Sequence, residues 1–128
     1  MKFDSGRILT LAGGLLALGT LLGAFGTHVL QGELPPDRMS FYTTAVSYQF
    51  IHALGFLGIG LAARSMDCAV LRWSAGLVLS GIVLFSGSLY GMAFAAPRAL
   101  GAVTGAGGVV LVAGWALFAY AMWRTRQR

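Results

Sequence analysis

Four long apolar stretches, separated by short polar segments, dominate the pattern of this chain. They cover residues 8–30, 41–63, 73–96 and 100–123, and none contains Asp, Glu, Lys or Arg. A helix needs about 20 residues to cross the hydrocarbon core of a bilayer. The prolines and the charges fall at the ends of the chain and in three connections, residues 31–40, 64–72 and 97–99. The pattern predicts an all-α fold: one transmembrane domain over residues 1–128, built as an integral membrane four-helix bundle.

The amino-acid composition also indicates a membrane environment. Only 10% of the 128 residues are charged, whereas a soluble domain normally carries about 25% because its surface must face water. The net charge of +5 could attract nucleic acid, but the basic residues stand singly at the ends of apolar runs. They form no basic patch interleaved with aromatic residues, as nucleic-acid sites do. We therefore expect the lipid bilayer as a partner and no nucleic acid.

The distribution of Lys and Arg predicts the orientation of the spans. Seven of these residues fall at the two ends of the chain and in the second connection: Lys2, Arg7, Arg64, Arg72, Arg124, Arg126 and Arg128. The other two, Arg38 and Arg98, fall in the first and third connections. Because cytoplasmic loops carry the excess of Lys and Arg, both termini should be cytoplasmic. Trp73 and Trp123 would then lie at the inner interface, as expected of an aromatic belt.

The first stretch admits a second interpretation. Lys2 and Arg7, followed by an apolar run, resemble a secretory signal peptide. The run is longer than the usual apolar region of such a peptide, and no clear Ala-x-Ala site follows it. Cleavage near Gly26 would also leave three spans with unbalanced flanks. We expect the first helix to be retained.

Polar side chains inside the spans are the candidate functional residues, because polar groups in a bilayer are costly and are commonly functional. We expect a cluster in the outer half of the membrane, formed by His28, Tyr48, Gln49, His52, Ser86, Ser88 and Tyr90. Gln49 and His52 share one helical face and could share a partner across the bundle. The cluster either fixes the register of the helices through hydrogen bonds, which we favour, or lines a small polar cavity open to the outside.

Small residues at four-residue spacing predict where the helices pack closely, since membrane helices associate through van der Waals fit and polar contacts. The pairs are Gly19 and Gly23, Gly76 and Ser80, Gly87 and Gly91, and Gly101 and Gly105. Such faces serve equally for packing within the bundle and for contact with another protein.

Several kinds of chemistry find no support in the sequence. Cys68 is the only cysteine, which excludes an intrachain disulfide and a Cys-based metal site. The two histidines differ in depth by about 13 Å at the helical rise, too far for two axial ligands of one haem iron. No Ser-His-Asp, Cys-His, Walker or paired-carboxylate arrangement is present. We therefore expect no catalytic residues, no metal, no cofactor and no enzyme activity.

Four blocks of the sequence resemble a known family. They are residues 23–28 (GAFGTH) with Leu30, residues 44–49 (TAVSYQ) with 52–54 (HAL), residues 81–90 (GIVLFSGSLY), and Gly107-Gly108 with Gly114-Trp115. They are similar to the domain-of-unknown-function 423 family, the YgdD and YwdK type of bacterial inner-membrane protein. The resemblance covers nearly the whole chain. It implies a multi-pass protein of four helices in the bacterial inner membrane, and it implies no activity.

The chain departs from the family pattern at two threonines. Thr27 stands where the family usually has alanine, and Thr104 is followed by glycine where a proline is common. Without that proline the start of the fourth helix should be straighter.

Two functions of different classes remain open. The one we prefer is an accessory or packing subunit that binds another membrane protein, or a second copy of itself, through its glycine-rich faces. The alternative is a small transporter or channel component that uses the outer polar cluster. The chain is too short for the two inverted halves typical of secondary transporters, which favours the accessory subunit.

Overall fold

The computed structural model describes residues 3–128 and consists of helices and short connections. Helix α1 (Ser5–Phe25) continues through a π-helical turn, η1 (Gly26–Leu30). Helices α2 (Pro36–Ala62) and α3 (Ala69–Ala93) follow, and a 3-10 turn, η2 (Arg98–Leu100), leads into α4 (Gly101–Arg126). Four segments are long and apolar enough to cross a membrane, which confirms the prediction of an all-α, four-span protein.

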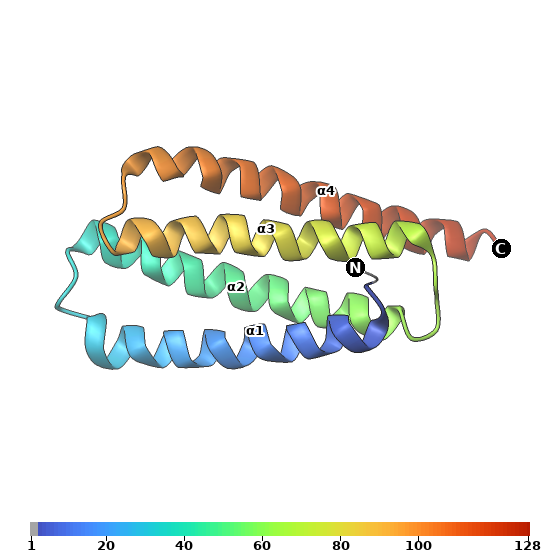
Figure 1. Cartoon of the computed structure of the whole chain (residues 1–128), viewed down its shortest axis with the longest axis horizontal. Coiled ribbons are helices and arrows are strands. Elements are labelled where there is room, and N and C mark those ends of the chain that lie inside the picture. Colours follow the sequence, from blue (N-terminus) through green and yellow to red (C-terminus); the bar gives the residue numbers. More distant parts are fainter. Residues whose placement is uncertain (1–2) are drawn as a thin grey trace.

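The four helices run antiparallel to their neighbours in chain order, and both termini lie at the same end (Figure 1). Each helix packs on the next one in the sequence: α1 on α2, α2 on α3, and α3 on α4. Helices α1 and α4 lie at opposite edges of this arrangement (Figure 1). The two edge helices therefore bury the smallest share of their surface and leave the most for lipid or for another protein.

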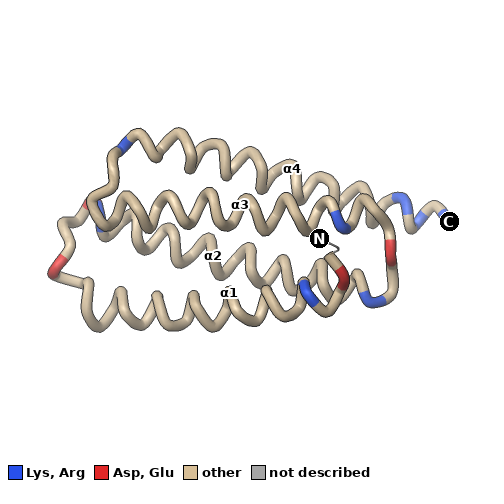
Figure 2. The backbone as a smooth tube through the Cα atoms, viewed as in Figure 1, with Lys and Arg blue, Asp and Glu red and all other residues tan. Residues whose placement is uncertain are grey.

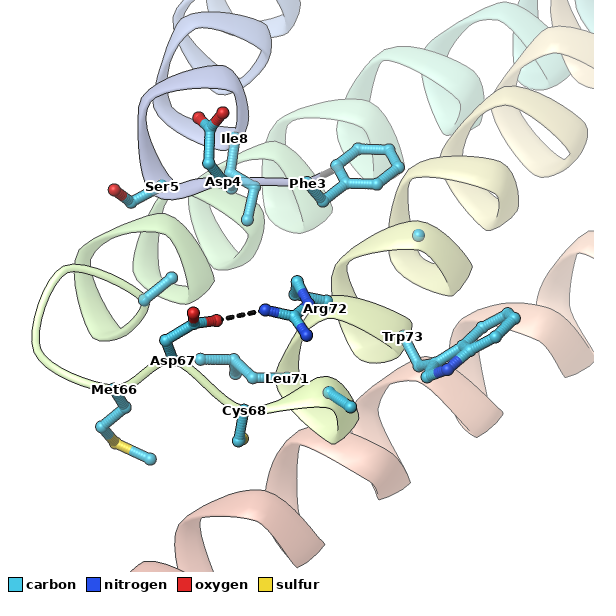
Figure 3. Close-up of a pocket in the computed structure, with 13 residues that line it drawn as sticks. Phe3, Asp4, Ser5, Ile8, Met66, Asp67, Cys68, Leu71, Arg72 and Trp73 are labelled. Atoms are coloured by element: carbon cyan, nitrogen blue, oxygen red, sulfur yellow. Dashed lines mark hydrogen bonds and ion pairs between the residues drawn. The ribbon is translucent and has the colours of Figure 1, made fainter. Parts of the chain in front are cut away.

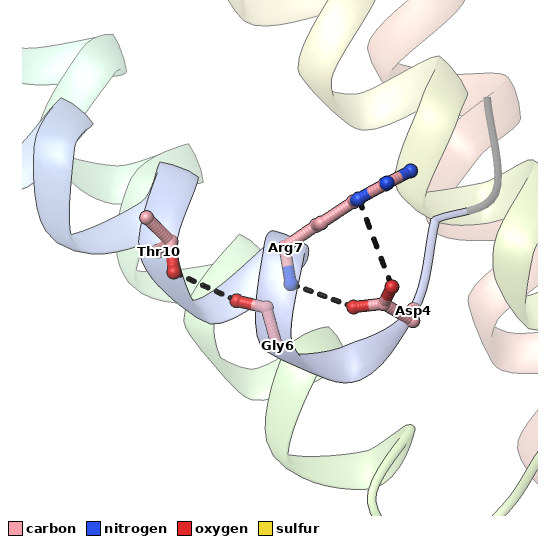
Figure 4. Close-up of polar contacts among 4 residues, drawn as sticks. All are labelled: Asp4, Gly6, Arg7 and Thr10. Carbon is pink, nitrogen blue, oxygen red and sulfur yellow. Dashed lines mark hydrogen bonds and ion pairs between the residues drawn. The ribbon is translucent and has the colours of Figure 1, made fainter.

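Local chemistry sets where the helices begin and end. The Asp4 carboxylate caps α1 by accepting a 2.9 Å hydrogen bond from the Arg7 N–H, and Thr10 bonds back to the Gly6 carbonyl (Figure 4). Helix α2 begins at Pro36 rather than at residue 41, because proline is well suited to the first helical position. Helix α3 ends at Ala93 rather than at residue 96, and Ala95 follows with a φ of +72°.

Glycine brings the backbones of α3 and α4 into direct contact. A Cβ at Gly107 would lie 2.6 Å from the Phe85 backbone N, and one at Gly81 would lie 3.0 Å from the Leu111 N. Gly114 stands equally close to the backbone of α3, since a Cβ there would lie 3.0 Å from the Val78 N. Only a residue without a side chain fits at these points. Helix α4 is continuous from Gly101 to Arg126.

Only some of the predicted packing residues lie close to a neighbouring helix in this arrangement. A Cβ at Gly19 would lie 3.3 Å from Gln49 and Phe50 of α2, and one at Gly23 would lie 3.6 Å from Val46. A Cβ at Gly91 would lie 3.2 Å from Leu100, beyond the end of its own helix. The nearest atom to a Cβ at Gly76 would be in Phe3, at 4.0 Å, and Ser80 is exposed and bonds to the Gly76 carbonyl of its own helix.

Gly87, Gly101 and Gly105 do not pack within the described bundle, which leaves contact with another protein as the remaining interpretation of these predicted positions. A Cβ at any of the three would meet nothing within 4 Å. The reason for Gly87 is helical geometry: Phe85 faces α4, and two residues along a helix turn the side chain about 200° away from that direction. The glycines at the close contact between α3 and α4 are instead Gly81, Gly107 and Gly114.

Charged residues lie only at the two ends of the described bundle (Figure 2). The end with the termini holds six arginines and two aspartates: Arg7, Arg64, Arg72, Arg124, Arg126, Arg128, Asp4 and Asp67. The opposite end holds two arginines and two acidic residues: Arg38, Arg98, Glu33 and Asp37. Lys2, part of the predicted cytoplasmic count, lies outside the described residues. The folded chain thus places the unbalanced positive charge at one end.

Substitution at Gly107 should destabilise the bundle where the same substitution two residues away should not. Gly107→Ala would force the α3 and α4 backbones apart, and overpacking typically costs about 1–3 kcal/mol. Gly105→Ala is the matched control, because its added methyl group meets open space. Equilibrium unfolding in detergent measures both variants. Equal stability of the two variants would show that the α3–α4 contact is misplaced.

The charge asymmetry gives a test of orientation. A reporter that works only in the cytoplasm should be active when fused after Arg128, because the basic end of the bundle should stay inside. A reporter that works only in the periplasm should be active when inserted between Glu33 and Arg38. The opposite activity at either position would contradict an orientation with both termini cytoplasmic.

Candidate functional site

The polar residues inside the spans form two groups that face different neighbours. Gln49 is directed toward α1 and α3, whereas His52 is directed toward α4. The prediction that Gln49 and His52 share a partner is therefore wrong. Three residues apart on a helix are still separated by about 60° around its axis, which is enough to send the two side chains to opposite sides of α3.

Gln49 joins three helices through its side-chain amide. Its Nε2 donates to the Leu15 carbonyl of α1 at 2.9 Å, and its Oε1 accepts from the Tyr90 hydroxyl of α3 at 2.7 Å. The side chain is only 3% exposed. Tyr42, about two turns away along α2, adds a hydrogen bond from its hydroxyl to the Leu22 carbonyl. These bonds attach the edge helix α1 to the rest of the bundle.

Serines make three further bonds between helices. Ser86 Oγ donates to the Ala45 carbonyl at 2.9 Å, and Ser74 Oγ donates to the Gly114 carbonyl at 2.8 Å. Ser88 and Thr104 share a hydrogen bond of 2.6 Å between α3 and α4. Among residues 3–128, every fully buried side-chain nitrogen and oxygen has a partner. This pattern favours a register-fixing role for the predicted cluster over a hydrated cavity.

His28 lies apart from the other predicted residues. It is exposed on the π-helical turn η1, at the end of the bundle opposite the termini. Tyr42 of α2 packs on Gly26 of the same turn, where a Cβ would lie 3.1 Å from Tyr42 Cδ1.

His52 forms the centre of the second group. Trp115 of α4 donates from its indole Nε1 to His52 Nδ1 at 3.0 Å, and the two rings stack with centroids 6.0 Å apart. Because indole N–H can only donate, His52 Nδ1 must carry a lone pair, so the imidazole is neutral with its proton on Nε2. Gly55 makes this contact possible, since a Cβ there would stand 2.6 Å from Trp115 Cζ2.

A groove of about 560 Å³ opens beside this pair between α2 and α4. Its aromatic wall is continuous, because the Tyr48 ring lies 4.6 Å from the Phe85 ring and 5.7 Å from the His52 ring. Its other wall belongs to α4 and contains Gly105, Gly108, Val109, Val112 and Trp115. Helix α4 therefore offers a low, flat surface next to the aromatic residues of α2.

Two polar groups in the groove have no partner in the described part of the chain. Neither the Nε2–H of His52 nor the hydroxyl of Tyr48 makes a hydrogen bond within residues 3–128. Both residues lie near the middle of the 27-residue helix α2, at the depth of the hydrocarbon core. The groove can therefore bind a group that is largely apolar and presents a hydrogen-bond acceptor.

Sequence reasoning missed Trp115 as the partner of His52. A signal was present, since Trp115 stands in the middle of its span, whereas tryptophans of membrane proteins concentrate at the interfaces. A buried indole N–H usually needs an acceptor. No glycine lies four residues before or after Gly55, so the spacing pattern that indicates close packing does not mark this residue.

Replacing Gln49 should weaken the attachment of three helices at once. Gln49→Leu removes two hydrogen bonds and should cost about 1 kcal/mol, since bonds between membrane helices average about 0.6 kcal/mol each. Tyr90→Phe removes only the bond to Gln49, so the double variant should lose less than the sum of the two single losses. Unfolding in detergent measures all three variants. Strictly additive losses would contradict the Gln49–Tyr90 bond.

Comparison with known proteins assigns the chain to a family. The model of the family described as "Protein of unknown function (DUF423)" matches residues 22–108. A UPF0382 membrane protein of Staphylococcus epidermidis is 44% identical over 84% of this chain and 86% of its own length. No solved structure matches.

Two further relatives carry the names expected from the sequence blocks. The UPF0382 membrane protein YwdK of Bacillus subtilis is 39% identical, covering 89% of this chain and 92% of its own. The UPF0382 inner membrane protein YgdD of Escherichia coli is 42% identical, covering 75% and 73%. The resemblance inferred from the sequence is thereby confirmed. The chain belongs to the DUF423 family and is a multi-pass protein of the bacterial inner membrane.

Proposed function

We propose that this protein is a non-enzymatic accessory subunit that binds a transmembrane helix of another membrane protein in the groove between α2 and α4. The observation that carries the proposal is the pair of unpartnered polar groups, His52 Nε2–H and the Tyr48 hydroxyl, at mid-membrane depth. Lipid tails offer no hydrogen-bond acceptor, so a polar group left there is costly. A neighbouring helix can supply an acceptor from a Ser, Thr or Asn side chain or from a backbone carbonyl.

The shape of α4 supports a helix as the occupant. A Cβ at Gly101 or Gly105 would meet nothing within 4 Å. Closely spaced glycines of this kind allow the backbone of another helix to approach. Val109 and Val112, one and two turns further along, are each 70% exposed. Together these residues form a low ridge of small side chains, of which Gly105, Val109 and Val112 line the groove. The adjoining glycines of α4, Gly107 and Gly114, are already occupied by α3.

The transporter alternative receives less support from the same geometry. A transport pathway through the predicted cluster needs polar groups that are free to bind a solute. Gln49, Ser86 and Ser88 are instead buried and paired with residues of neighbouring helices. We therefore propose a structural role for that group and a binding role for the groove.

Site-directed photocrosslinking in the native membrane tests the accessory function. A benzoylphenylalanine at Val109 should give one discrete product with a transmembrane segment of another protein, at fixed stoichiometry. Gly105→Leu should lower its yield at least about fivefold, because a large side chain on the ridge costs about 1–3 kcal/mol of contact. The crosslinked peptides should be identified by mass spectrometry.

The same probe at Leu21 is the matched control. Leu21 is 69% exposed but lies on α1, at the opposite edge of the bundle. A product from Leu21 with equal yield, or a Val109 product unaffected by Gly105→Leu, would contradict the groove as the binding site. A product with a second copy of this chain alone would contradict a different protein as the partner.

A further inference from the structure

A second cavity, of about 670 Å³, lies at the end of the bundle that holds the termini (Figure 3). It exists because α1 and α3 both pack on α2 and leave a gap between their first turns. The Phe3 ring reaches across that gap toward Gly76. The walls come from residues 3–8, from the connection between α2 and α3, and from the first two turns of α3.

The cavity combines groups of both signs. Arg72 of α3 forms an ion pair with Asp67 of the preceding connection (Figure 3). Asp4 lies on the opposite wall, but its carboxylate caps α1, approaches Arg7 Nε at 3.7 Å and is directed away from Arg72 (Figure 3). The first turn of α3 also contributes, because Cys68 caps none of its N–H groups and an uncapped helix start favours negative charge.

The remaining lining is apolar and continuous with the membrane-spanning part. Ile8 and Leu71 are almost fully buried and form its inner side. Trp73, 70% exposed, lies at the rim next to Arg72. Tryptophan is enriched at the level of the lipid headgroups, so this cavity lies where headgroups and the first part of the acyl chains meet.

We propose that this cavity binds a zwitterionic aminophospholipid from the leaflet on the side of the chain termini. The lipid phosphate pairs with Arg72 and the first N–H groups of α3. The primary ammonium donates to Asp67, which a quaternary ammonium cannot do. One acyl chain lies against Phe3 and Trp73, apolar lining residues that are not fully buried. A purely anionic headgroup fits poorly, since the Asp67 carboxylate lies beside the one guanidinium that lines the cavity.

Native mass spectrometry of the whole chain, released from nanodiscs with equal amounts of phosphatidylethanolamine, phosphatidylglycerol and phosphatidylcholine, tests the proposal. The protein should retain one phosphatidylethanolamine about tenfold more often than either other lipid, as one additional charge-assisted bond of about 1.4 kcal/mol would give. Asp67→Asn should abolish the preference over phosphatidylglycerol, and Arg72→Gln should lower the retention of all three lipids.

The opposite end of the bundle supplies the matched controls. Arg98 and Asp37 form an ion pair of 3.3 Å that is also open to solvent, so Asp37→Asn and Arg98→Gln should leave the preference unchanged. Equal retention of the three lipids by the wild-type chain would overturn the proposal and indicate only the ordinary lipid shell. An equal effect of the control variants would also overturn it.

Soluble O-phosphoethanolamine, the free headgroup, distinguishes a site for the lipid from a site for the headgroup alone. This test needs no variant. It should displace bound phosphatidylethanolamine from the wild-type chain only weakly, because it lacks the acyl chain that lies against Phe3 and Trp73. Displacement at a concentration matching that of the lipid would overturn the assignment to a lipid and leave a headgroup site.

Discussion

The structure depends on the direct contact between the backbones of α3 and α4. In a bilayer the hydrophobic effect gives helices little reason to associate, because lipid tails are as apolar as the side chains they would replace. Gly81, Gly107 and Gly114 remove the side chains from the contact, so that dispersion and close fit can act. With α3 and α4 joined, α2 packs on α3, and α1 is attached through α2. The order of packing follows the chain and leaves two edge helices.

Hydrogen bonds then fix how the helices are registered. Gln49 ties α2 to both α1 and α3, and Ser86 and Ser74 bond to carbonyls of adjacent helices. Each bond contributes modestly, but a shift of one helix by a single turn would leave several polar groups unpaired in lipid. The polar residues of the bundle interior are therefore best understood as selecting one packing. The groove residues Tyr48 and His52 differ, since their remaining polar atoms face outward.

Much of this fold follows from the sequence, because span length and charge placement obey strong constraints in a bilayer. Which glycines pack is harder to foresee. Four-residue spacing marks Gly101 and Gly105 as readily as it marks Gly19 and Gly23, and only the rotation of α4 decides that Gly107 and Gly114 face α3. The His52–Trp115 contact is hard to predict for the same reason, because the packing of the helices decides which residues of separate spans meet. Sequence periodicity fixes a face of a helix but not its neighbour.

Trp115 fixes the tautomer of His52, and the Nε2–H of that ring is the donor that the proposed partner would accept from. Solid-state nitrogen NMR of the histidine-labelled chain reports both features, with His28→Gln leaving one histidine signal. In bilayers of pure lipid we expect a neutral ring with the proton on Nε2 and no strong hydrogen bond there. In native membranes the Nε2 resonance should shift as the partner supplies an acceptor. A proton on Nδ1 would contradict the bond from Trp115, and an Nε2 resonance identical in both membranes would contradict the proposed partner.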